Sequence, residues 1–374
     1  MKRMTKLLCL ILAVALLLPL TGCLENTSSG NTKTIVDHDG YSVTVPEKIQ
    51  RVVVCDIYPL PSVLSIFFDS AEKIVGMAPT SMSAAKNSLL GELYPEILNA
   101  STAFMEGGEV NVEELMKLQP DVVFYSAGNS ELSQKLRNAG FNAIGVSTNK
   151  WEYDCMETLN QWIQLFSQLF PDNSDKVEKV QKKSQEMYDL VQKRVGELSE
   201  AERERVFFLF SYSETAMATS GSSFFGQWWA ETVGAVNVAE EVKTDNSVAV
   251  NLEQVYQWNP SMILITNFNT AQPKDLYENT VGNYDWSGID AVQNKQVYKM
   301  PLGMSRSYTP GVDTPITMLW LAKTVYPELF KDLNVTEQAK EYYQEVFGVS
   351  LTDAQINGIF QPTSGAGEDF FLYN

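Results

Sequence analysis

The sequence predicts an α/β protein of two similar lobes, each with a parallel-rich sheet, joined by one long rigid helix. Three observations lead to this prediction. Short apolar runs alternate with helical patterns, as they do in parallel α/β units. A long polar segment with a single apolar stripe separates the two halves of the chain. A motif of the first half recurs 140 residues later in the second half (251 − 111 = 140).

The composition is that of a folded globular protein, and it argues against several classes of function. Of the 374 residues, 44% are hydrophobic and 20% are charged. The formal net charge of −18 argues against nucleic acid as a partner, because phosphate binding needs a surplus of Lys and Arg. A single histidine, His38, argues against His-based metal sites and His-dependent catalytic triads. The four cysteines lack CxxC spacing, which excludes a zinc ribbon or an iron–sulfur site. We therefore expect no metal-ligating residues and no catalytic residues.

The first residues carry the pattern of an export signal. A basic start precedes an apolar run over 7–20, whose fourteen residues are too few for a bilayer that needs about 20. The run ends in Leu20-Thr21-Gly22-Cys23, which resembles the lipobox of bacterial lipoproteins. We expect a signal peptide over 1–22, then a lipidated Cys23 and a tether over 23–33. This places the protein on the extracytoplasmic face of the cell membrane. The alternative is a plain signal peptide with an accidental cysteine.

The first lobe is assigned to residues 34–170. After a short hairpin piece at Val43–Val45, we expect strands at Arg51–Cys55, Ile74–Ala78, Asp121–Tyr125 and Asn142–Val146, with helices that include Pro61–Phe68, Val112–Leu118 and Glu131–Ala139. Cys55 and Cys155 remain after export. Because Cys55 lies in an apolar strand-like run, where buried free thiols are common, we expect free thiols, with a disulfide as the alternative.

The linking helix is assigned to residues 171–203 and the second lobe to residues 204–374. N-cap residues follow Pro171, and apolar residues then recur at helical spacing from Val177 to Leu198. At 1.5 Å per residue such a helix spans roughly 45 Å. An ordinary surface helix, or two shorter ones, is the alternative. In the second lobe we expect strands at Val206–Phe210, Met262–Thr266 and Val297–Met300, and helices at Ser223–Val233, Leu252–Gln257 and Thr314–Tyr326.

The internal repeat sets two carboxylates at equivalent positions. Asn111 and Glu114 in the first copy, and Asn251 and Gln254 in the second, fit capping boxes, and a proline ends each helix before a strand. Glu113 and Glu253 are second in their helices. A carboxylate there is stabilising by about 0.3–1 kcal/mol, which by itself explains one glutamate. A matched pair also suits docking to a two-fold symmetric partner with Arg pockets, and we expect that role.

The whole mature chain resembles the substrate-binding lipoproteins of ABC importers for iron–siderophore, haem and cobalamin, the class III periplasmic binding proteins. The resemblance rests on the lipobox at Cys23, the lobe–helix–lobe order, the two N-x-E phrases and the ending over 319–328. It implies two Rossmann-like lobes joined by one rigid helix, with the ligand in the cleft between them. It also implies that Glu113 and Glu253 meet Arg residues on the two permease subunits.

Candidate ligand-binding residues follow from the topology, because ligands of open α/β sheets bind beyond the carboxyl ends of the strands. The loops there are rich in aromatic, methionine and hydroxyl groups, which suits a bulky and partly apolar ligand. The residues chosen are Tyr58, Pro59, Met82, Asn129, Tyr212, Ser223, Phe224, Asn267, Met304, Arg306 and Tyr308. Arg306 is the sharpest candidate, since a cation in this acidic protein can pair with an anionic group. Its alternative role is a bond to a loop carbonyl, and the tyrosines and methionines are otherwise packing residues.

The predicted function is capture of an Fe(III) chelate, a siderophore or a haem-like molecule, and its delivery to an ABC permease dimer with its ATPase. No cofactor is expected, and the protein is expected to be a monomer. Cobalamin or an oxyanion such as molybdate is the alternative ligand. A surface hydrolase is the alternative from another class, but the chain lacks a G-x-S-x-G elbow and a usable histidine.

Overall fold

The structure is a computed structural model that describes residues 31–171, 174–244 and 246–363. The predicted signal peptide, Cys23 and most of the tether lie outside these residues. The contacts of the chain divide it after Thr32, and both lobes belong to the unit Lys33–Asn374. Within the described residues, no helix has the length and apolarity to cross a bilayer.

Four parallel strands form the first sheet, in the order β4-β3-β7-β8. They are β3 (Val52–Val54), β4 (Ile74–Met77), β7 (Val122–Ser126) and β8 (Ala143–Val146). Every residue of β3 and β8 is buried, as expected for a parallel sheet covered on both faces. The predicted strands are therefore confirmed to within one or two residues.

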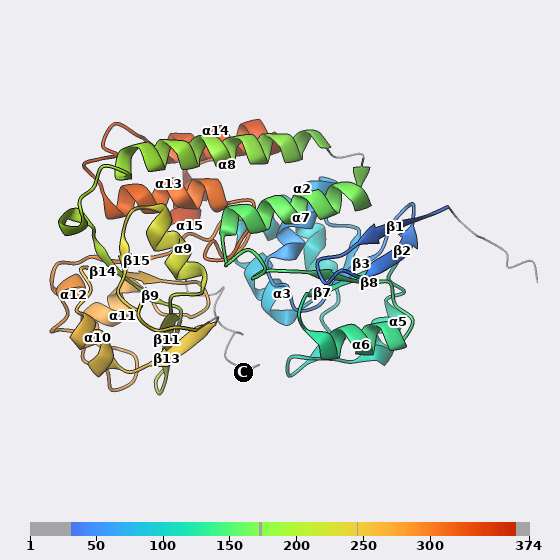
Figure 1. Cartoon of the computed structure of the whole chain (residues 1–374), viewed down its shortest axis with the longest axis horizontal. Coiled ribbons are helices and arrows are strands. Elements are labelled where there is room, and N and C mark those ends of the chain that lie inside the picture. The colour runs from blue at the N-terminus through green and yellow to red at the C-terminus, as the bar shows by residue number, and fades with distance from the viewer. Residues whose placement is uncertain (1–30, 172–173, 245, 364–374) are drawn as a thin grey trace, which may run out of the picture. The chain divides into compact units, whose positions relative to one another are not determined.

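Helices and two small hairpins complete the first lobe (Figure 1). The helices are α2 (Leu60–Phe68), α3 (Pro79–Lys86), α4 (Leu89–Leu93), α5 (Val112–Lys117), α6 (Ser130–Asn138) and α7 (Cys155–Leu169), with a 3-10 turn η1 (Pro95–Asn99). The hairpins are β1 (Thr32–Val36) with β2 (Ser42–Pro46), and β5 (Met105–Glu106) with β6 (Glu109–Val110). The hairpin piece expected at Val43–Val45 is β2.

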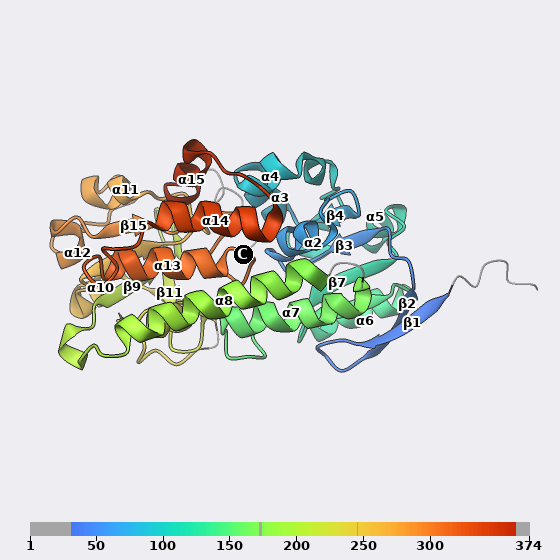
Figure 2. The same ribbon diagram turned by 90° about the horizontal axis from the view of Figure 1, so that it is seen from above.

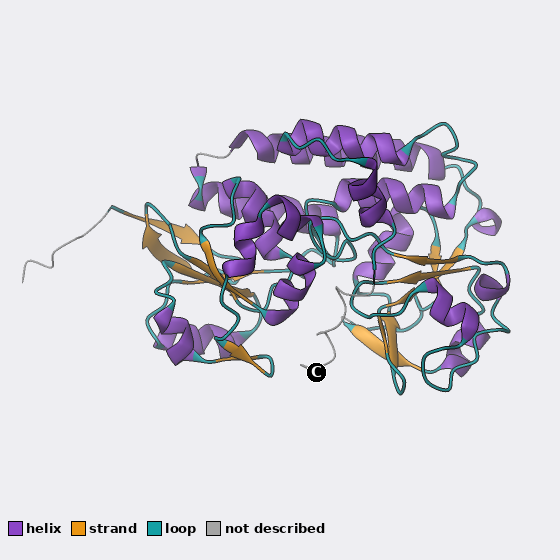
Figure 3. Ribbon diagram, turned by 180° about the vertical axis from the view of Figure 1, so that it is seen from behind, coloured by secondary structure: helices purple, strands orange, loops and turns teal. Residues whose placement is uncertain are grey.

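The second lobe repeats the topology of the first. Its parallel sheet has the order β12-β9-β14-β15, with β9 (Arg205–Leu209), β12 (Val236–Asn237), β14 (Met262–Ile265) and β15 (Val297–Lys299). In both sheets the strands, numbered along the chain, lie in the order 2-1-3-4. Figure 3 shows the two groups of strands, each flanked by helices. The shared order confirms that the halves are similar.

The second lobe also contains elements that the sequence patterns did not indicate. An antiparallel sheet joins β10 (Ser211–Tyr212), β11 (Met217–Ser220) and β13 (Ser247–Val250). These strands are short, and β13 is nowhere fully buried, so their sequences carry little periodic signal. The helices are α9 (Phe225–Thr232), α10 (Leu252–Trp258), α11 (Pro273–Glu278), α12 (Asp290–Gln293), α13 (Thr314–Val325), α14 (Val335–Phe347) and α15 (Asp353–Phe360).

The linking helix is α8 (Ser174–Val195), which ends before the predicted Arg203. Gly196 follows it, and a 3-10 turn, η3, occupies Glu200–Glu202. Glycine disfavours helix by about 1 kcal/mol, which explains the early end. The helix is about 33 Å long at 1.5 Å per residue. Val177 and Val180 pack into the core of the first lobe, whereas Val191 and Val195 pack into that of the second. One rigid helix therefore contributes to both cores.

The C-terminal helices pack against the first lobe as well as the second. Ala339, Tyr342 and Tyr343 of α14 and Ile356 of α15 belong to the same hydrophobic core as β3 and α7. Figure 2 shows α14 running beside α8. The lobe boundaries assigned from the sequence stay a prediction, because this packing crosses them. Cys55 and Cys155 are both buried and free, as expected.

Candidate functional site

A cavity of about 370 Å³ lies between the lobes, at the carboxyl ends of the strands. This is where parallel α/β sheets bind ligands. First-lobe residues of its lining are Asp56, Ile57, Tyr58, Pro59, Ser126 and Thr148; second-lobe residues are Phe210, Ser211, Phe224, Phe225, Asn246, Ser247, Phe268, Thr309 and Pro310. Of the predicted ligand-binding residues, Tyr58, Pro59 and Phe224 line this cavity.

Aromatic rings form its second-lobe wall. The ring of Phe224 meets that of Phe210 edge-on, with 5.4 Å between centroids. It is tilted against the ring of Phe225, with 5.1 Å between centroids. Phe268 lies 5.1 Å from Phe210. Tyr308, a predicted residue, is fully buried behind these rings, 5.6 Å from Phe210. It supports the wall and does not line the cavity. Such interlocked rings provide a rigid apolar surface for a ligand.

The first-lobe wall contributes a carboxylate, Asp56. The main-chain N–H of Ser126 donates to one of its oxygens at 2.6 Å, and the side-chain amide of Asn129 donates to the other at 2.9 Å. Asn129, a predicted residue, therefore orients Asp56. Burial and the nearby Asp56 raise the pKa of Tyr58, and the positive charge of Arg306 opposes that shift. Tyr58 is thus a neutral hydrogen-bonding group at the cavity.

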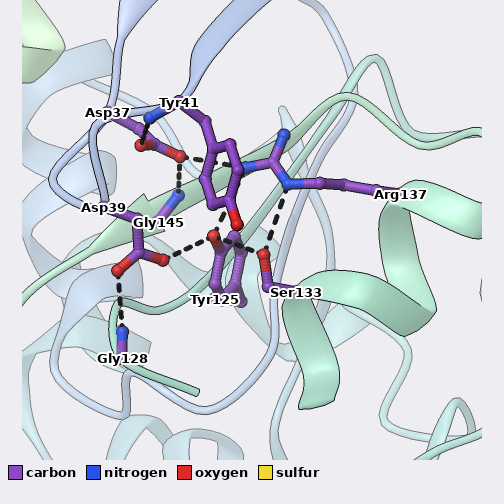
Figure 4. Close-up of polar contacts among 8 residues, drawn as sticks. All are labelled: Asp37, Asp39, Tyr41, Tyr125, Gly128, Ser133, Arg137 and Gly145. Carbon is purple, nitrogen blue, oxygen red and sulfur yellow. Dashed lines mark hydrogen bonds and ion pairs between the residues drawn. The ribbon is translucent and has the colours of Figure 1, made fainter. Parts of the chain in front are cut away.

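A polar network behind the first-lobe wall fixes the loop that carries Ser126 (Figure 4). Asp39, at the tip of the β1–β2 hairpin, accepts from the Gly128 N–H at 2.9 Å and from the Tyr125 hydroxyl at 2.6 Å. Gly128 has φ +91°, which glycine adopts without strain. The same hydroxyl accepts from Ser133 at 2.8 Å. Asp39 on one side and Asp56 on the other thus hold one cavity loop.

Arg306 lies between the lobes and is buried, 2% exposed. Its Nη1 donates to the Thr80 carbonyl of the first lobe at 3.0 Å, and its Nε donates to the Asn267 carbonyl at 2.9 Å. Its guanidinium is 5.1 Å from the centre of the Phe268 ring. Arg306 therefore stands beside the aromatic wall and bridges the lobes. Asn267, also a predicted residue, is buried and donates to the carbonyls of Met300 and Pro301.

The remaining predicted ligand residues are not part of the cavity lining. Met82 and Met304 are buried in the core shared by the first lobe and α14. Tyr212 is buried in the second lobe and accepts from the indole N–H of Trp286 at 2.9 Å. Ser223 is exposed. The sequence reasoning missed Asp56, Phe210 and Phe268, although each directly follows a strand or lies within three residues of its end. That position was the signal that could have found them.

The two matched glutamates are both exposed, each at the second position of its helix. The side chain of Asn111 caps α5 by accepting from the N–H groups of Glu113 and Glu114, and that of Asn251 caps α10 by accepting from the Gln254 N–H. Both predicted N-caps are confirmed. The predicted capping boxes are not completed in either helix. The Asn111 N–H donates to the Phe104 carbonyl and Glu114 pairs with Lys117, and the Gln254 side-chain amide donates to Gln257.

The sequence pattern of the family described as periplasmic binding protein matches residues 69–302, which spans β4 to the loop after β15. The chain belongs to this family. Its structural neighbours are class III periplasmic binding proteins of ABC importers. The protein is accordingly a periplasmic binding protein of an ABC transporter, and the family places it outside the cytoplasm. Members of the family bind solutes and are not enzymes.

Three relatives cover nearly the whole binding protein. The molybdate-binding protein MolA of Haemophilus influenzae is 26% identical to this chain, over 85% of this chain and 92% of its own length. The structure of MolA with bound molybdate superposes with a TM-score of 0.73 at 25% identity. That superposition covers 86% of this chain and 99% of the MolA chain. A periplasmic solute-binding protein from Veillonella parvula gives a TM-score of 0.77 at 26% identity, covering 88% and 97%. CeuE of Helicobacter pylori, in a nickel–histidine complex, shares the fold with a TM-score of 0.68 at 21% identity, covering 87% and 98%.

A metal ion held by the protein itself needs several ligating side chains in one place. Across residues 31–171, 174–244 and 246–363, no three His, Cys, Asp or Glu side chains come together in a way that could hold an ion.

Proposed function

We propose that this binding protein captures a partly apolar metal chelate of the ferric siderophore class in the cavity between its lobes and delivers it to an ABC permease. The observation that carries the proposal is the aromatic wall of Phe210, Phe224, Phe225 and Phe268, which forms the second-lobe side of the cavity. Apolar cavities with a few placed polar groups are typical of sites for organic ligands.

Size and charge both support a chelate over a bare ion. A small tetrahedral oxyanion would leave most of the 370 Å³ unfilled. Among the described residues that line the cavity, none is Lys, Arg or His, and Asp56 contributes a carboxylate. A dianion bound there would face this carboxylate, whereas Arg306 lies beside the wall, 5.1 Å from the Phe268 ring, and is not part of the cavity lining. These conditions favour a neutral or weakly charged chelate.

Molybdate is the second candidate, and a specific observation favours it. The Haemophilus influenzae relative that binds molybdate is 26% identical across 92% of its length. Arg306 and the hydroxyls of Ser211, Ser247 and Thr309 are the groups that would receive an oxyanion here. Cobalamin has no comparable support.

The test is the identity and affinity of the ligand. Native mass spectrometry and visible absorbance of the purified mature chain report what it retains. Tryptophan fluorescence titrations then compare ferric hydroxamate and catecholate siderophores, haemin, cobalamin and molybdate. Phe224→Ala should weaken chelate binding by about tenfold or more, since a buried aromatic contact contributes above 1.4 kcal/mol. Leu329→Ala, at an exposed site outside the cavity lining, is the control. Tight binding of molybdate with no binding of any chelate would overturn the iron assignment.

Delivery is proposed to use Glu113 and Glu253, which would pair with Arg residues of the two permease subunits. The double variant Glu113→Ala, Glu253→Ala should abolish uptake and leave ligand affinity unchanged. Each lobe offers a matched control, an acidic residue in the first turn of the helix that precedes the last strand of its parallel sheet. These residues are Glu131 in α6, before β8, and Asp290 in α12, before β15. Replacing this second pair by Ala should leave uptake intact. If the Glu113→Ala, Glu253→Ala variant loses ligand affinity, the two glutamates act on ligand binding and the docking role is wrong.

Membrane anchoring is proposed to depend on the thiol of Cys23. Cys23→Ser should release the protein from the membrane fraction and prevent incorporation of labelled fatty acid. Retention of the variant in the membrane fraction would argue for a different anchor, and release of both forms would argue for a plain signal peptide.

A further inference from the structure

The two copies of the repeat, one around each glutamate, match residue by residue in the exposure of their side chains. Over 111–119 and over 251–259, nine consecutive positions show the same sequence of exposed, intermediate and buried side chains. Leu115 and Val255, four residues after each N-cap, are both fully buried. Gln119 and Asn259 end the two units with positive φ, +46° and +41°. The helices α5 and α10 therefore expose equivalent faces to solvent, one in each lobe.

That face bears a large apolar side chain in each lobe. Among the described residues, six large apolar side chains are exposed: Val36, Tyr41, Leu98, Met116, Tyr256 and Leu329. Met116 is 48% exposed and Tyr256 is 38% exposed. They occupy matched positions (256 − 116 = 140). Exposed apolar side chains at equivalent sites of both lobes are not required by either core.

Each apolar side chain lies one helical turn beyond a glutamate. Residues three apart are neighbours on a helix surface, so Glu113 adjoins Met116 and Glu253 adjoins Tyr256. Figure 1 places α5 and α10 in different lobes, both on the side away from α8. A carboxylate beside an apolar group is thus displayed twice, once per lobe.

Tyr256 is presented in a fixed position. Its hydroxyl donates to the Asp285 carbonyl at 2.7 Å and accepts from the Gly288 N–H at 3.2 Å. A ring held in place loses little side-chain entropy when a partner covers it, which favours it as an interface anchor. Met116 is unbranched and adaptable, and methionine is enriched at the cores of interfaces.

We propose that Met116 and Tyr256 are the apolar anchors of the permease-docking face, each seated in a pocket beside the basic group that receives the neighbouring glutamate. This inference rests on the proposed function and extends it from two charges to two composite sites. The partner that fits is a membrane protein dimer, because its two-fold axis presents the same basic and apolar groups to both lobes.

Charge selects this occupant over a second copy of the chain. If the face paired with itself, Glu113 and Glu253 would approach the same acidic side chains on a molecule whose formal net charge is −18. Like charges across an interface are costly, whereas a basic partner satisfies both the carboxylates and the overall charge.

The test measures affinity for the permease complex, identified by cross-linking to the wild-type chain in native membranes and reconstituted in lipid nanodiscs. The double variant Met116→Ser, Tyr256→Ser should weaken binding by about 100-fold, at about tenfold for each anchor. Leu98→Ser, Leu329→Ser removes two exposed apolar side chains at unmatched positions and should stay within about twofold of wild type. Tyr256→Phe keeps the ring but loses the hydroxyl bonds, and it should also stay within about twofold.

The outcomes separate this inference from the proposed function. If Glu113→Ala, Glu253→Ala abolishes binding and the Met116, Tyr256 variant does not weaken it, the inference is wrong and the glutamates alone dock. If the glutamate variant also binds normally, or no permease is cross-linked, docking by this face fails altogether. If Tyr256→Phe loses about tenfold in affinity, the loss expected for one anchor, together with thermal stability, the tyrosine is structural and is not an anchor.

Discussion

The buried carboxylate of Asp37 offers a sharp test of how the β1–β2 hairpin is held to the first lobe. Its side chain is fully buried and accepts three N–H groups, from Tyr41 at 2.8 Å, Gly145 at 2.9 Å and the Arg137 guanidinium at 3.1 Å (Figure 4). Asp37→Ala removes both carboxylate oxygens, and with them all three hydrogen bonds, while Gly145 stays buried in β8. We expect the variant to fold with reduced stability.

The expected loss is about 2–4 kcal/mol in the free energy of unfolding. The orphaned Gly145 N–H costs about 1–3 kcal/mol, because it is buried. The Arg137 side chain is 26% exposed, so water compensates much of its lost ion pair and we assign it about 1 kcal/mol. Tyr41 is an exposed residue, and its N–H can be hydrated at little cost.

Urea unfolding followed by tryptophan fluorescence measures this free energy. Glu47→Ala, at an exposed position after β2, is the control and should change it by less than about 0.5 kcal/mol. In an Arg137→Met background, the effect of Asp37→Ala should shrink by about 1 kcal/mol, since the ion pair is already absent. A loss below about 1 kcal/mol in Asp37→Ala would refute this account of the hairpin.

Three further predictions concern the second lobe and its link to the first. Burial lowers the pKa of Lys299 from 10.5 to about 7. Between these two pH values the unfolded chain binds more protons than the folded chain, so the free energy of unfolding should rise with pH. Lys299→Met should flatten that rise in urea titrations. Arg306→Met removes its bond to a first-lobe carbonyl and should widen the lobe separation in small-angle scattering and weaken ligand binding measured by tryptophan fluorescence; unchanged values of both would contradict its bridging role. Gly303→Ala should lower the free energy of unfolding by about 2 kcal/mol or more, because a Cβ would lie 2.4 Å from the Asp313 carboxyl. Gly358→Ala should raise it by about 0.5–1 kcal/mol, because the new methyl group meets open space in α15. Thermal melts measure both changes.

Ligand residues were predicted from the sequence with uneven success, and the difference has a physical cause. Tyr58 and Pro59 lie four and five residues after the end of β3, in the loop that the strand direction carries to the sheet edge. Met304 lies in a long irregular loop whose path depends on contacts made elsewhere. The buried Asp313 carboxylate accepts the Met304 N–H at 2.6 Å and the Tyr343 hydroxyl of α14, which turns Met304 into the core. The Asp313 pKa is raised to about 6 by this burial.

The sequence by itself determined most strands of the two parallel sheets and the internal repeat, because periodicity, N-caps and helix-ending prolines act within a few residues. The predicted strands, the caps at Asn111 and Asn251 and the exposure of Glu113 and Glu253 follow from such local signals, whereas the antiparallel strands β10, β11 and β13 do not. Only the tertiary structure decided which loop side chains face the cavity. Arg306 shows why: its partner Thr80 is 226 residues away, and no local pattern encodes a contact over that separation.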